Sequence, residues 1–182
     1  MKLAVISTSR IVDEFLANLG DMPQIEVAAL CCRPQSAPKA EAWAAQYGIG
    51  RVCTDEAALL AEGGFDAVYI GTANHLHHST AKRVLAAGYH VILEKPFTAT
   101  AAEARELFAL ADSKGVMIFE AITTPYLPEY AFLLQELPKI GPVRGVMASF
   151  CARSRRYDDY LAGIWTVSYT HLRAHETRRH VV

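Results

Sequence analysis

The sequence predicts an α/β fold, built as a Rossmann-type doubly wound parallel sheet and followed by the start of an incomplete α+β second domain. Apolar runs rich in β-branched residues alternate with longer segments of helical period, which implies right-handed crossovers between parallel strands. These runs are continuously apolar, as is typical of strands that are covered on both faces. The pattern changes after about residue 120, where prolines become frequent and a second domain is expected to begin.

The first half of the predicted sheet alternates regularly. Residues 3–6 and 25–31 are predicted strands, and residues 11–19 between them form a helix with its apolar side chains on one face. An alanine-rich helix at residues 37–47 then leads to a short strand at residues 51–53.

The second half repeats this order. Residues 55–61 form the next predicted helix, with Thr54 as its N-cap. A strand at residues 66–70 and a helix at residues 79–87 follow, and Gly88 is expected at the C-terminal end of that helix.

The last predicted helix of the sheet domain carries the clearest end signals. Thr100 caps a helix that runs to about Lys114, Glu103 stands at the capping-box spacing, and Gly115 ends the helix. Apolar runs on either side complete the six-stranded pattern. They are residues 90–93 and 116–119.

The chain beyond the sheet is expected to contain the start of a second domain and a tail. A helix near residues 129–137 and a strand near residues 143–151 would start a second domain that has too few elements to close a core alone. We therefore assign residues 1–120 to a dinucleotide-binding domain, residues 121–166 to a truncated second domain, and residues 167–182 to a non-native tail.

The assignment of the tail depends on its sequence. Residues 167–177 resemble one translated frame of the transposase adapter used in short-read library preparation, so the natural sequence would stop near Thr166. His171 and His175 have the spacing of two metal ligands on one helix face, with His180 nearby. No carboxylate occupies the positions that a metallopeptidase helix needs, and we expect no metal site.

Composition excludes several classes of protein. The formal net charge of -1 argues against a nucleic-acid-binding surface, which needs a basic excess. No apolar run approaches the length of about 18 residues that a membrane span requires, and the N-terminal run is too short for a signal peptide. The four cysteines, among them the adjacent Cys31 and Cys32, lack Cys-x-x-Cys spacing and are expected to be buried thiols in a reducing cytoplasm. We expect a cytoplasmic protein without nucleic-acid or membrane partners.

The first candidate site is the turn after the first predicted strand. A dinucleotide turn usually reads Gly-x-Gly-x-x-Gly, because glycines permit the tight turn and the close approach of backbone to pyrophosphate. Ser7, Ser9 and Val12 occupy the three glycine positions here. The helix that begins near Ile11 would still offer N–H groups to an anion. A plain strand-to-helix turn is the alternative reading. The candidate cofactor contacts are Ser7, Thr8, Ser9, Arg10 and Ile11.

The second candidate site is the end of the second predicted strand. An acidic residue there would bind the ribose 2′-hydroxyl and favour NAD. Cys32 stands at that position and Arg33 follows, so a 2′-phosphate could pair with Arg33. A surface arginine without a ligand is the alternative.

The third candidate site is the polar stretch at residues 71–78, which follows the fourth predicted strand. Doubly wound sheets bind ligands at the carboxyl ends of their strands. Thr72, Asn74 and His75 are therefore candidate cofactor contacts. The three histidines of this stretch could suggest a metal, but no cysteine or carboxylate lies close by in the sequence, and we favour ligand contact.

The fourth candidate site is Glu94-Lys95-Pro96, at the carboxyl end of the fifth predicted strand. A Lys–Glu pair at the end of a buried strand costs too much desolvation to be idle unless it is paired or functional. The Lys95 ammonium could bind a substrate oxygen and stabilise its charge as hydride leaves the adjacent carbon. Glu94 and Lys95 are also candidate cofactor contacts.

Two of these stretches together resemble a known family. Residues 72–78 and 86–97 are similar to the Gfo/Idh/MocA oxidoreductases, the relatives of glucose–fructose oxidoreductase and inositol dehydrogenase. The second stretch is the specific part, and the resemblance covers about residues 1–166. Residues 120–121 and 126–128 resemble the branch that contains dihydrodiol and NADP-linked xylose dehydrogenases, although Pro125 stands where that branch often carries arginine.

The resemblance implies an NAD(P)-dependent oxidoreductase that transfers a hydride between nicotinamide and a secondary alcohol or ketone of a sugar, polyol or cyclic diol. NADP would be preferred over NAD, Lys95 would be the catalytic lysine, and the Lys95–Pro96 peptide would be cis. The family's later Asp/His pair, which supplies the proton acceptor, would lie beyond Thr166, so this fragment is expected to be inactive. The second domain, which begins at residue 121, would be the substrate and oligomerisation domain, and the full-length parent would be a homo-oligomer. The alternative is a non-catalytic dinucleotide-binding regulator or sensor.

Overall fold

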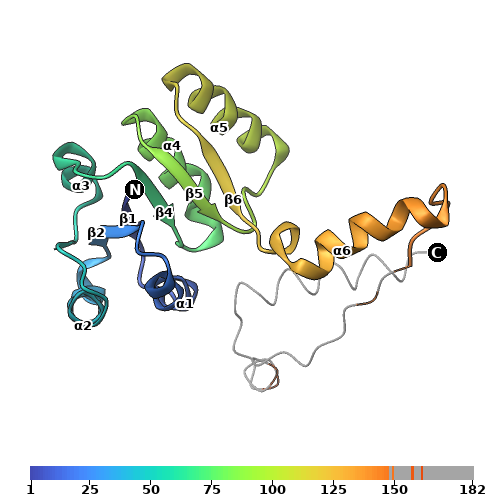
Figure 1. Ribbon diagram of the computed structural model, residues 1–182. Helices are drawn as coiled ribbons and strands as arrows, with labels where there is room; N and C mark the ends of the chain where they lie inside the picture. Colours follow the sequence, from blue (N-terminus) through green and yellow to red (C-terminus); the bar gives the residue numbers. More distant parts are fainter. Residues whose placement is uncertain (148, 150–156, 158–160, 162–182) are drawn as a thin grey trace. The chain divides into compact units, whose positions relative to one another are not determined.

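The computed structural model describes residues 1–147, 149, 157 and 161 and divides the chain into two units, Met1–Thr123 and Thr124–Val182 (Figure 1). The first unit contains one sheet in the order β3-β2-β1-β4-β5-β6, and every neighbouring pair of strands is parallel. The predicted doubly wound Rossmann-type sheet is therefore confirmed. Its strands are β1 (Lys2–Ile6), β2 (Glu26–Cys31), β3 (Val52–Cys53), β4 (Ala67–Ile70), β5 (His90–Glu94) and β6 (Ile118–Ala121).

Helices cover both faces of this sheet (Figure 1). The side chains of β1 alternate between two buried clusters: Ala4 and Ile6 pack with α3, α4 and α5, and Val5 packs with α1 and α2. All three side chains are buried, which explains why the strand is continuously apolar. The helices are α1 (Arg10–Asn18), α2 (Ala37–Tyr47), α3 (Glu56–Glu62), α4 (His77–Ala86) and α5 (Ala101–Lys114).

The predicted end signals of α5 are confirmed. The Thr100 hydroxyl accepts a hydrogen bond from the Glu103 N–H, and the Glu103 carboxylate accepts one from the Thr100 N–H. At the other end, Gly115 has a φ of 67°, and the Val116 N–H donates back to the Ala111 carbonyl. This closing turn uses the residues that were expected to start the next strand, so β6 begins at Ile118, two residues later than predicted.

Two other boundaries differ from the prediction. Asp55, not Thr54, caps α3, because its carboxylate accepts hydrogen bonds from the N–H groups of Ala57 and Ala58 at 2.8 and 3.2 Å. Helix α4 begins at His77, two residues earlier than expected, because a 3-10 turn over Asn74–Leu76 leads directly into it.

The described part of the second unit contains helix α6 (Pro128–Glu136) between two 3-10 turns, Thr124–Tyr126 and Leu137–Ile140. The helix predicted near residues 129–137 is confirmed, with proline at its first turn.

The strand predicted near residues 143–151 is wrong at residues 143–147 and 149, which are not in a strand. A strand needs a neighbour for its backbone hydrogen bonds, and no described residue pairs with this segment. The other residues of this stretch and the tail at residues 167–182 lie outside the described residues. Among the helices that the structure describes, none has the length and apolar character of a bilayer span.

Candidate cofactor site

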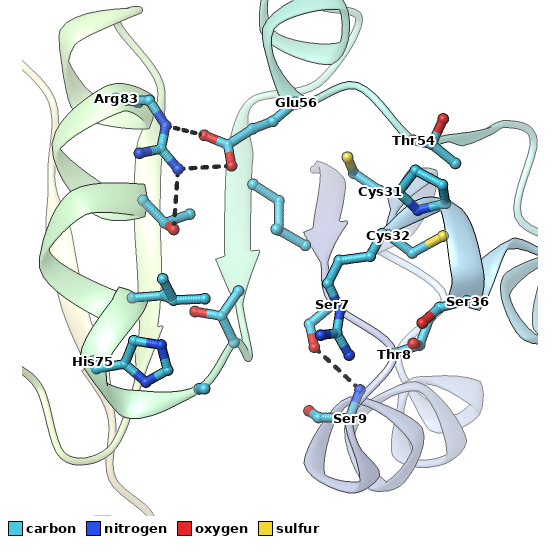
Figure 2. Close-up of a pocket in the computed structure, with 17 residues that line it drawn as sticks. Ser7, Thr8, Ser9, Cys31, Cys32, Ser36, Thr54, Glu56, His75 and Arg83 are labelled. Carbon is cyan, nitrogen blue, oxygen red and sulfur yellow. Dashed lines mark hydrogen bonds and ion pairs between the residues drawn. The ribbon is translucent and has the colours of Figure 1, made fainter.

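A cavity of about 590 Å³ opens at the carboxyl ends of β1 and β2 (Figure 2). It lies beside the switch point of the sheet, because β2 and β4 lie on opposite sides of β1 and the chain direction is the same in all three strands. Ligands bind at this place in doubly wound sheets. Seven residues predicted to bind cofactor line the cavity: Ser7, Thr8, Ser9, Cys32, Arg33, Thr72 and His75. Five predicted residues are not among its lining residues: Arg10, Ile11, Asn74, Glu94 and Lys95.

Ser7 gives the first turn its shape. Its φ is 114°, a backbone conformation that favours glycine and that costs a non-glycine residue about 1–3 kcal/mol. The conformation is held by hydrogen bonds: the Ser7 N–H donates to the Cys31 carbonyl at 2.9 Å, and the Ser7 hydroxyl accepts from the Ser9 N–H at 3.1 Å. Serine therefore adopts the geometry of the missing first glycine and adds a side-chain acceptor that glycine lacks.

Gly71 compensates for the missing third glycine. Val12 occupies that position on α1 and is completely buried. A Cβ atom added to Gly71 would lie 2.5 Å from the Val12 Cγ2 atom, closer than real carbon atoms approach. The contact between α1 and the sheet is therefore kept short by a glycine after β4, opposite the bulky residue. Sequence reasoning missed this role of Gly71, whose only signal was its place directly after an apolar run.

Helix α1 begins directly after the turn, with Ser9 as its N-cap residue. The Ser9 hydroxyl donates to the Gly71 carbonyl at 2.7 Å and makes no capping hydrogen bond to the helix. The first N–H groups of a helix have no partner inside the helix, and together with the helix dipole they favour an anion. Arg10 is exposed on this helix, and its Nε atom lies 3.6 Å from the Oε1 atom of Glu14.

The end of β2 offers a neutral and a cationic group. Burial raises the pKa of the Cys31 and Cys32 thiols, so both stay uncharged at neutral pH. Arg33 is exposed, lines the cavity, and makes no ion pair with any described residue. A ligand phosphate at this position would meet a guanidinium that pairs with no described carboxylate.

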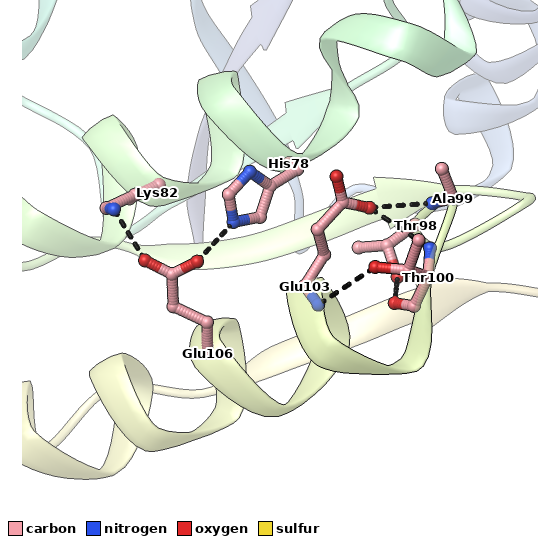
Figure 3. Close-up of polar contacts among 7 residues, drawn as sticks. All are labelled: His78, Lys82, Thr98, Ala99, Thr100, Glu103 and Glu106. Atoms are coloured by element: carbon pink, nitrogen blue, oxygen red, sulfur yellow. Dashed lines mark hydrogen bonds and ion pairs between the residues drawn. The ribbon is translucent and has the colours of Figure 1, made fainter.

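The stretch after β4 separates three histidines. His75 lines the cavity, and His77 is buried with its ring nitrogens facing backbone carbonyls. His78 binds Glu106 of α5 at 2.8 Å, on the surface between α4 and α5 (Figure 3). Within the described residues, no three His, Cys, Asp or Glu side chains form a group that could hold a metal ion.

Thr72 carries a buried hydroxyl oxygen that has no hydrogen-bond partner among the described residues, and Thr72 lines the cavity. An unpaired buried hydroxyl costs about 1–3 kcal/mol. The oxygen has almost no accessible surface, so a ligand in the cavity would supply the missing partner after rotation of the Thr72 side chain.

Hydrogen bonds to backbone atoms hold the Glu94-Lys95-Pro96 segment in place. The buried Glu94 carboxylate accepts a hydrogen bond from the Tyr69 hydroxyl at 2.8 Å and another from the Lys95 N–H at 3.1 Å. Burial first, and then the hydrogen bond to Glu94, raises the pKa of Tyr69, so that the Tyr69 hydroxyl remains a donor.

The Lys95 side chain is exposed and makes no ion pair with a described residue. The Lys95–Pro96 peptide is cis, as the resemblance implied. Glu94 therefore fixes the backbone of Lys95 and leaves its ammonium available.

An ion pair at the other end of the cavity was not expected from the sequence. Arg83 of α4 binds Glu56 of α3 through two hydrogen bonds of 2.6 and 3.0 Å and also donates to the Thr80 hydroxyl at 3.3 Å (Figure 2). Ser36 and Thr54 also line the cavity. These residues belong to separate elements and form no local motif, so only the folded sheet brings them together.

Comparison with known proteins agrees with this geometry. The model of an oxidoreductase family with an NAD-binding Rossmann fold, Gfo/Idh/MocA, matches residues 1–122. The scyllo-inositol 2-dehydrogenase (NADP(+)) IolU of Bacillus subtilis is 36% identical over 163 residues, which are 90% of this chain and 49% of that protein. The trans-1,2-dihydrobenzene-1,2-diol dehydrogenase of Sus scrofa is 30% identical over 152 residues, 82% of this chain and 45% of that protein.

A solved structure has the same architecture. The 3-ketoreductase KijD10 from Actinomadura kijaniata, in complex with TDP-benzene and NADP, superimposes with a TM-score of 0.71 at 29% identity, over 76% of this chain and 43% of that one. The chain spans about half the length of the relatives that it matches. Because the family model matches most of the chain, including the sheet and the cavity, the chain belongs to the Gfo/Idh/MocA oxidoreductases with an NAD-binding Rossmann fold.

Proposed function

We propose that the full-length protein is an NAD(P)-dependent dehydrogenase that transfers a hydride between nicotinamide and a secondary alcohol or ketone carbon of a sugar, polyol or cyclic diol. The observation that carries the proposal is the cavity at the switch point. It combines the α1 N-terminus with the Thr72 hydroxyl, which has no partner among the residues that the structure describes. The names of the relatives support the substrate class, since they act on an inositol, on a dihydrodiol and as a 3-ketoreductase.

The chain offers groups that suit each part of a dinucleotide. The α1 N-terminus and the turn at Ser7, Thr8 and Ser9 would hold the pyrophosphate, with Arg10 and Ile11 at the helix start. We assign Thr72, Asn74 and His75 to the wall of the site. Bound NAD(P) would supply the hydride acceptor or donor.

Cofactor preference is proposed to depend on the end of β2. Cys32 is uncharged where an acidic residue would bind the ribose 2′-hydroxyl and repel a phosphate. The Arg33 guanidinium lines the cavity, pairs with no described carboxylate and would bind a 2′-phosphate. NADP is therefore the proposed cofactor, with NAD as the weaker one.

Lys95 is the proposed catalytic residue of the substrate half. Its backbone is fixed by Glu94 and its ammonium is unpaired within the described residues, so it would hydrogen-bond the substrate oxygen as charge develops there. Glu94 would act through this backbone contact. The proton acceptor is proposed to lie in the part of the parent protein that this chain does not include, so the chain alone would bind dinucleotide without turnover. A homo-oligomeric, cytoplasmic parent is also proposed from the resemblance and the composition.

The test uses the full-length protein and a panel of inositols, pentoses and trans-dihydrodiols with NADP⁺ or NAD⁺. Reduction of the nicotinamide with at least one member, faster with NADP⁺, is the expected result. The opposite result would be dinucleotide binding without turnover on any member, in a full-length protein that has a histidine beyond position 166. It would contradict the proposed dehydrogenase activity and favour a regulator or sensor.

A further inference from the structure

The buried ring of His77 joins two segments that follow neighbouring strands. Its Nδ1 atom lies 2.8 Å from the carbonyl oxygen of Pro96, after β5, and its Nε2 atom lies 3.1 Å from the carbonyl oxygen of Thr72, after β4. The residue is 1% exposed. A neutral imidazole donates to one of these carbonyls and an imidazolium donates to both. In either state the ring fills the space between the two segments.

One end of this bridge faces the cavity. Thr72 lines the cavity, and its buried hydroxyl has no partner among the described residues. The backbone carbonyl of the same residue is the one that His77 contacts. A ligand that hydrogen-bonds the Thr72 hydroxyl would therefore act on a residue whose backbone is already tied to His77.

The other end of the bridge lies beside Lys95. Three contacts hold the segment that contains this lysine: the Lys95 N–H donates to Glu94 at 3.1 Å, the Phe97 N–H donates to Glu120 at 3.0 Å, and the Pro96 carbonyl meets His77. Glu94 belongs to β5 and Glu120 to β6. Of the three contacts, the one with His77 reaches the cavity wall.

We propose that His77 is a positioning residue that transmits dinucleotide binding at the Thr72 hydroxyl to the backbone of Lys95, an inference that rests on the proposed dehydrogenase function. Cofactor that binds Thr72 fixes the carbonyl of that residue, the His77 ring follows this carbonyl, and the Pro96 carbonyl follows the ring. The Lys95 ammonium is thereby aligned when cofactor is present.

The experiment titrates the ¹⁵N-labelled 182-residue chain with NADPH and follows the backbone amide signals of Thr72, Lys95 and Phe97. We expect all three signals of the unsubstituted chain to shift with one dissociation constant. In His77→Gln and His77→Phe, the Thr72 signal should still shift and NADPH affinity should stay within about threefold. The shifts of Lys95 and Phe97 should fall to less than half. The glutamine variant keeps a polar side chain in case the phenylalanine variant does not fold.

Matched variants separate the two ends of the bridge. Thr72→Val, which removes the hydroxyl and keeps the shape, should weaken NADPH binding about tenfold, the loss of one hydrogen bond to a ligand. Thr72→Ser, which keeps the hydroxyl, should stay within about threefold. His78→Gln alters the neighbouring histidine on the surface, where it binds Glu106 (Figure 3), and should leave all three shifts unchanged.

The outcomes distinguish the inference from the proposed function. Undiminished shifts of Lys95 and Phe97 in both His77 variants would overturn the role of His77 and leave the proposed function intact. Unchanged NADPH affinity in Thr72→Val would overturn the role assigned to the Thr72 hydroxyl. If the unsubstituted chain bound neither NADPH nor NADH, the cofactor site itself would be refuted, and the inference with it.

Discussion

The turn after β1 and the segment after β5 arrive at functional geometry in opposite ways. The turn has lost all three glycines of the dinucleotide fingerprint, yet Ser7 has a φ of 114° and Gly71 provides the close approach to Val12. The Glu94-Lys95-Pro96 segment keeps its family pattern. Glu94 and Pro96 have fixed contacts, and the Lys95 ammonium makes no ion pair with a described residue. A backbone requirement can be met by another residue, whereas the ammonium that is proposed to bind the substrate oxygen has to stay in its place.

The strongest test of this difference is Lys95→Ala in the full-length protein. Turnover should fall by about a hundred- to ten-thousand-fold, as expected for loss of a group that stabilises charge in the transition state. Cofactor affinity should stay within a few-fold, because the main partner of the ammonium would be the reacting oxygen. Steady-state rates and a nicotinamide fluorescence titration measure the two quantities. Unchanged turnover would reduce Lys95 to a structural residue at the end of β5.

Arg33→Ala tests the cofactor end of the cavity. Loss of a charge-assisted hydrogen bond to a 2′-phosphate should weaken NADPH binding by about ten- to a hundredfold. NADH binding should change by less than about twofold, since NADH lacks this phosphate and the guanidinium makes no ion pair with a described residue. Fluorescence titration with both cofactors gives the ratio of the two dissociation constants. An equal loss for NADH and NADPH would contradict the assignment of Arg33 to the 2′-phosphate.

Gly71→Ala tests the compensating glycine. The new methyl group would lie 2.5 Å from Val12 Cγ2, and overpacking of this kind costs about 1–3 kcal/mol. The free energy of unfolding from urea titration measures the loss. In the double variant with Val12→Ala, the two changes should cost less than the sum of the single ones, because the second opens the space that the first needs. Strict additivity would mean that the two residues do not share this contact.

Ser7→Gly should have the smallest effect, and in the opposite direction. Glycine adopts a φ of 114° without a Cβ penalty, so the folded state should gain about 1 kcal/mol from relief of strain. Part of this gain is offset by lost hydrogen bonding to the Ser9 N–H and by the greater freedom of glycine in the unfolded chain. Urea unfolding against Thr8→Gly, a neighbour without positive φ, is the comparison. If Thr8→Gly raised the free energy of unfolding more than Ser7→Gly did, the backbone strain assigned to Ser7 would be refuted.

Periodicity predicted the elements of the sheet well because it reflects burial. Val5 and its neighbours in β1 are buried on both faces, and that requirement is written into each residue type. The capping box of Thr100 and Glu103 was equally local and was confirmed. Competition between adjacent residues was harder to predict, since Thr54 and Asp55 are both good caps and only the folded chain gives α3 the second one.

Contacts between distant elements were beyond the reach of these patterns. Glu56 and Arg83 are 27 residues apart, and nothing near either residue indicates that they meet beside the cavity. The same is true of His77, which was not among the predicted ligand contacts of its stretch. Nothing in the sequence indicated that its ring faces two backbone carbonyls. The strand expected near residues 143–151 is wrong at residues 143–147 and 149 for a related reason, because a strand forms only where a neighbour is available and no described residue pairs with them.

The lack of space for a side chain at Gly71 has a practical consequence for engineering. Libraries that aim to change cofactor preference commonly vary a whole loop, and residues 71–78 would be an obvious choice here. Thr72, Asn74 and His75 can be diversified within such a library. Most side chains placed at Gly71 would instead push α1 away from β4, since the space is filled by a residue 59 positions earlier in the chain. Gly71 and Val12 therefore have to be exchanged as a pair, large for small, if folded variants are to be recovered.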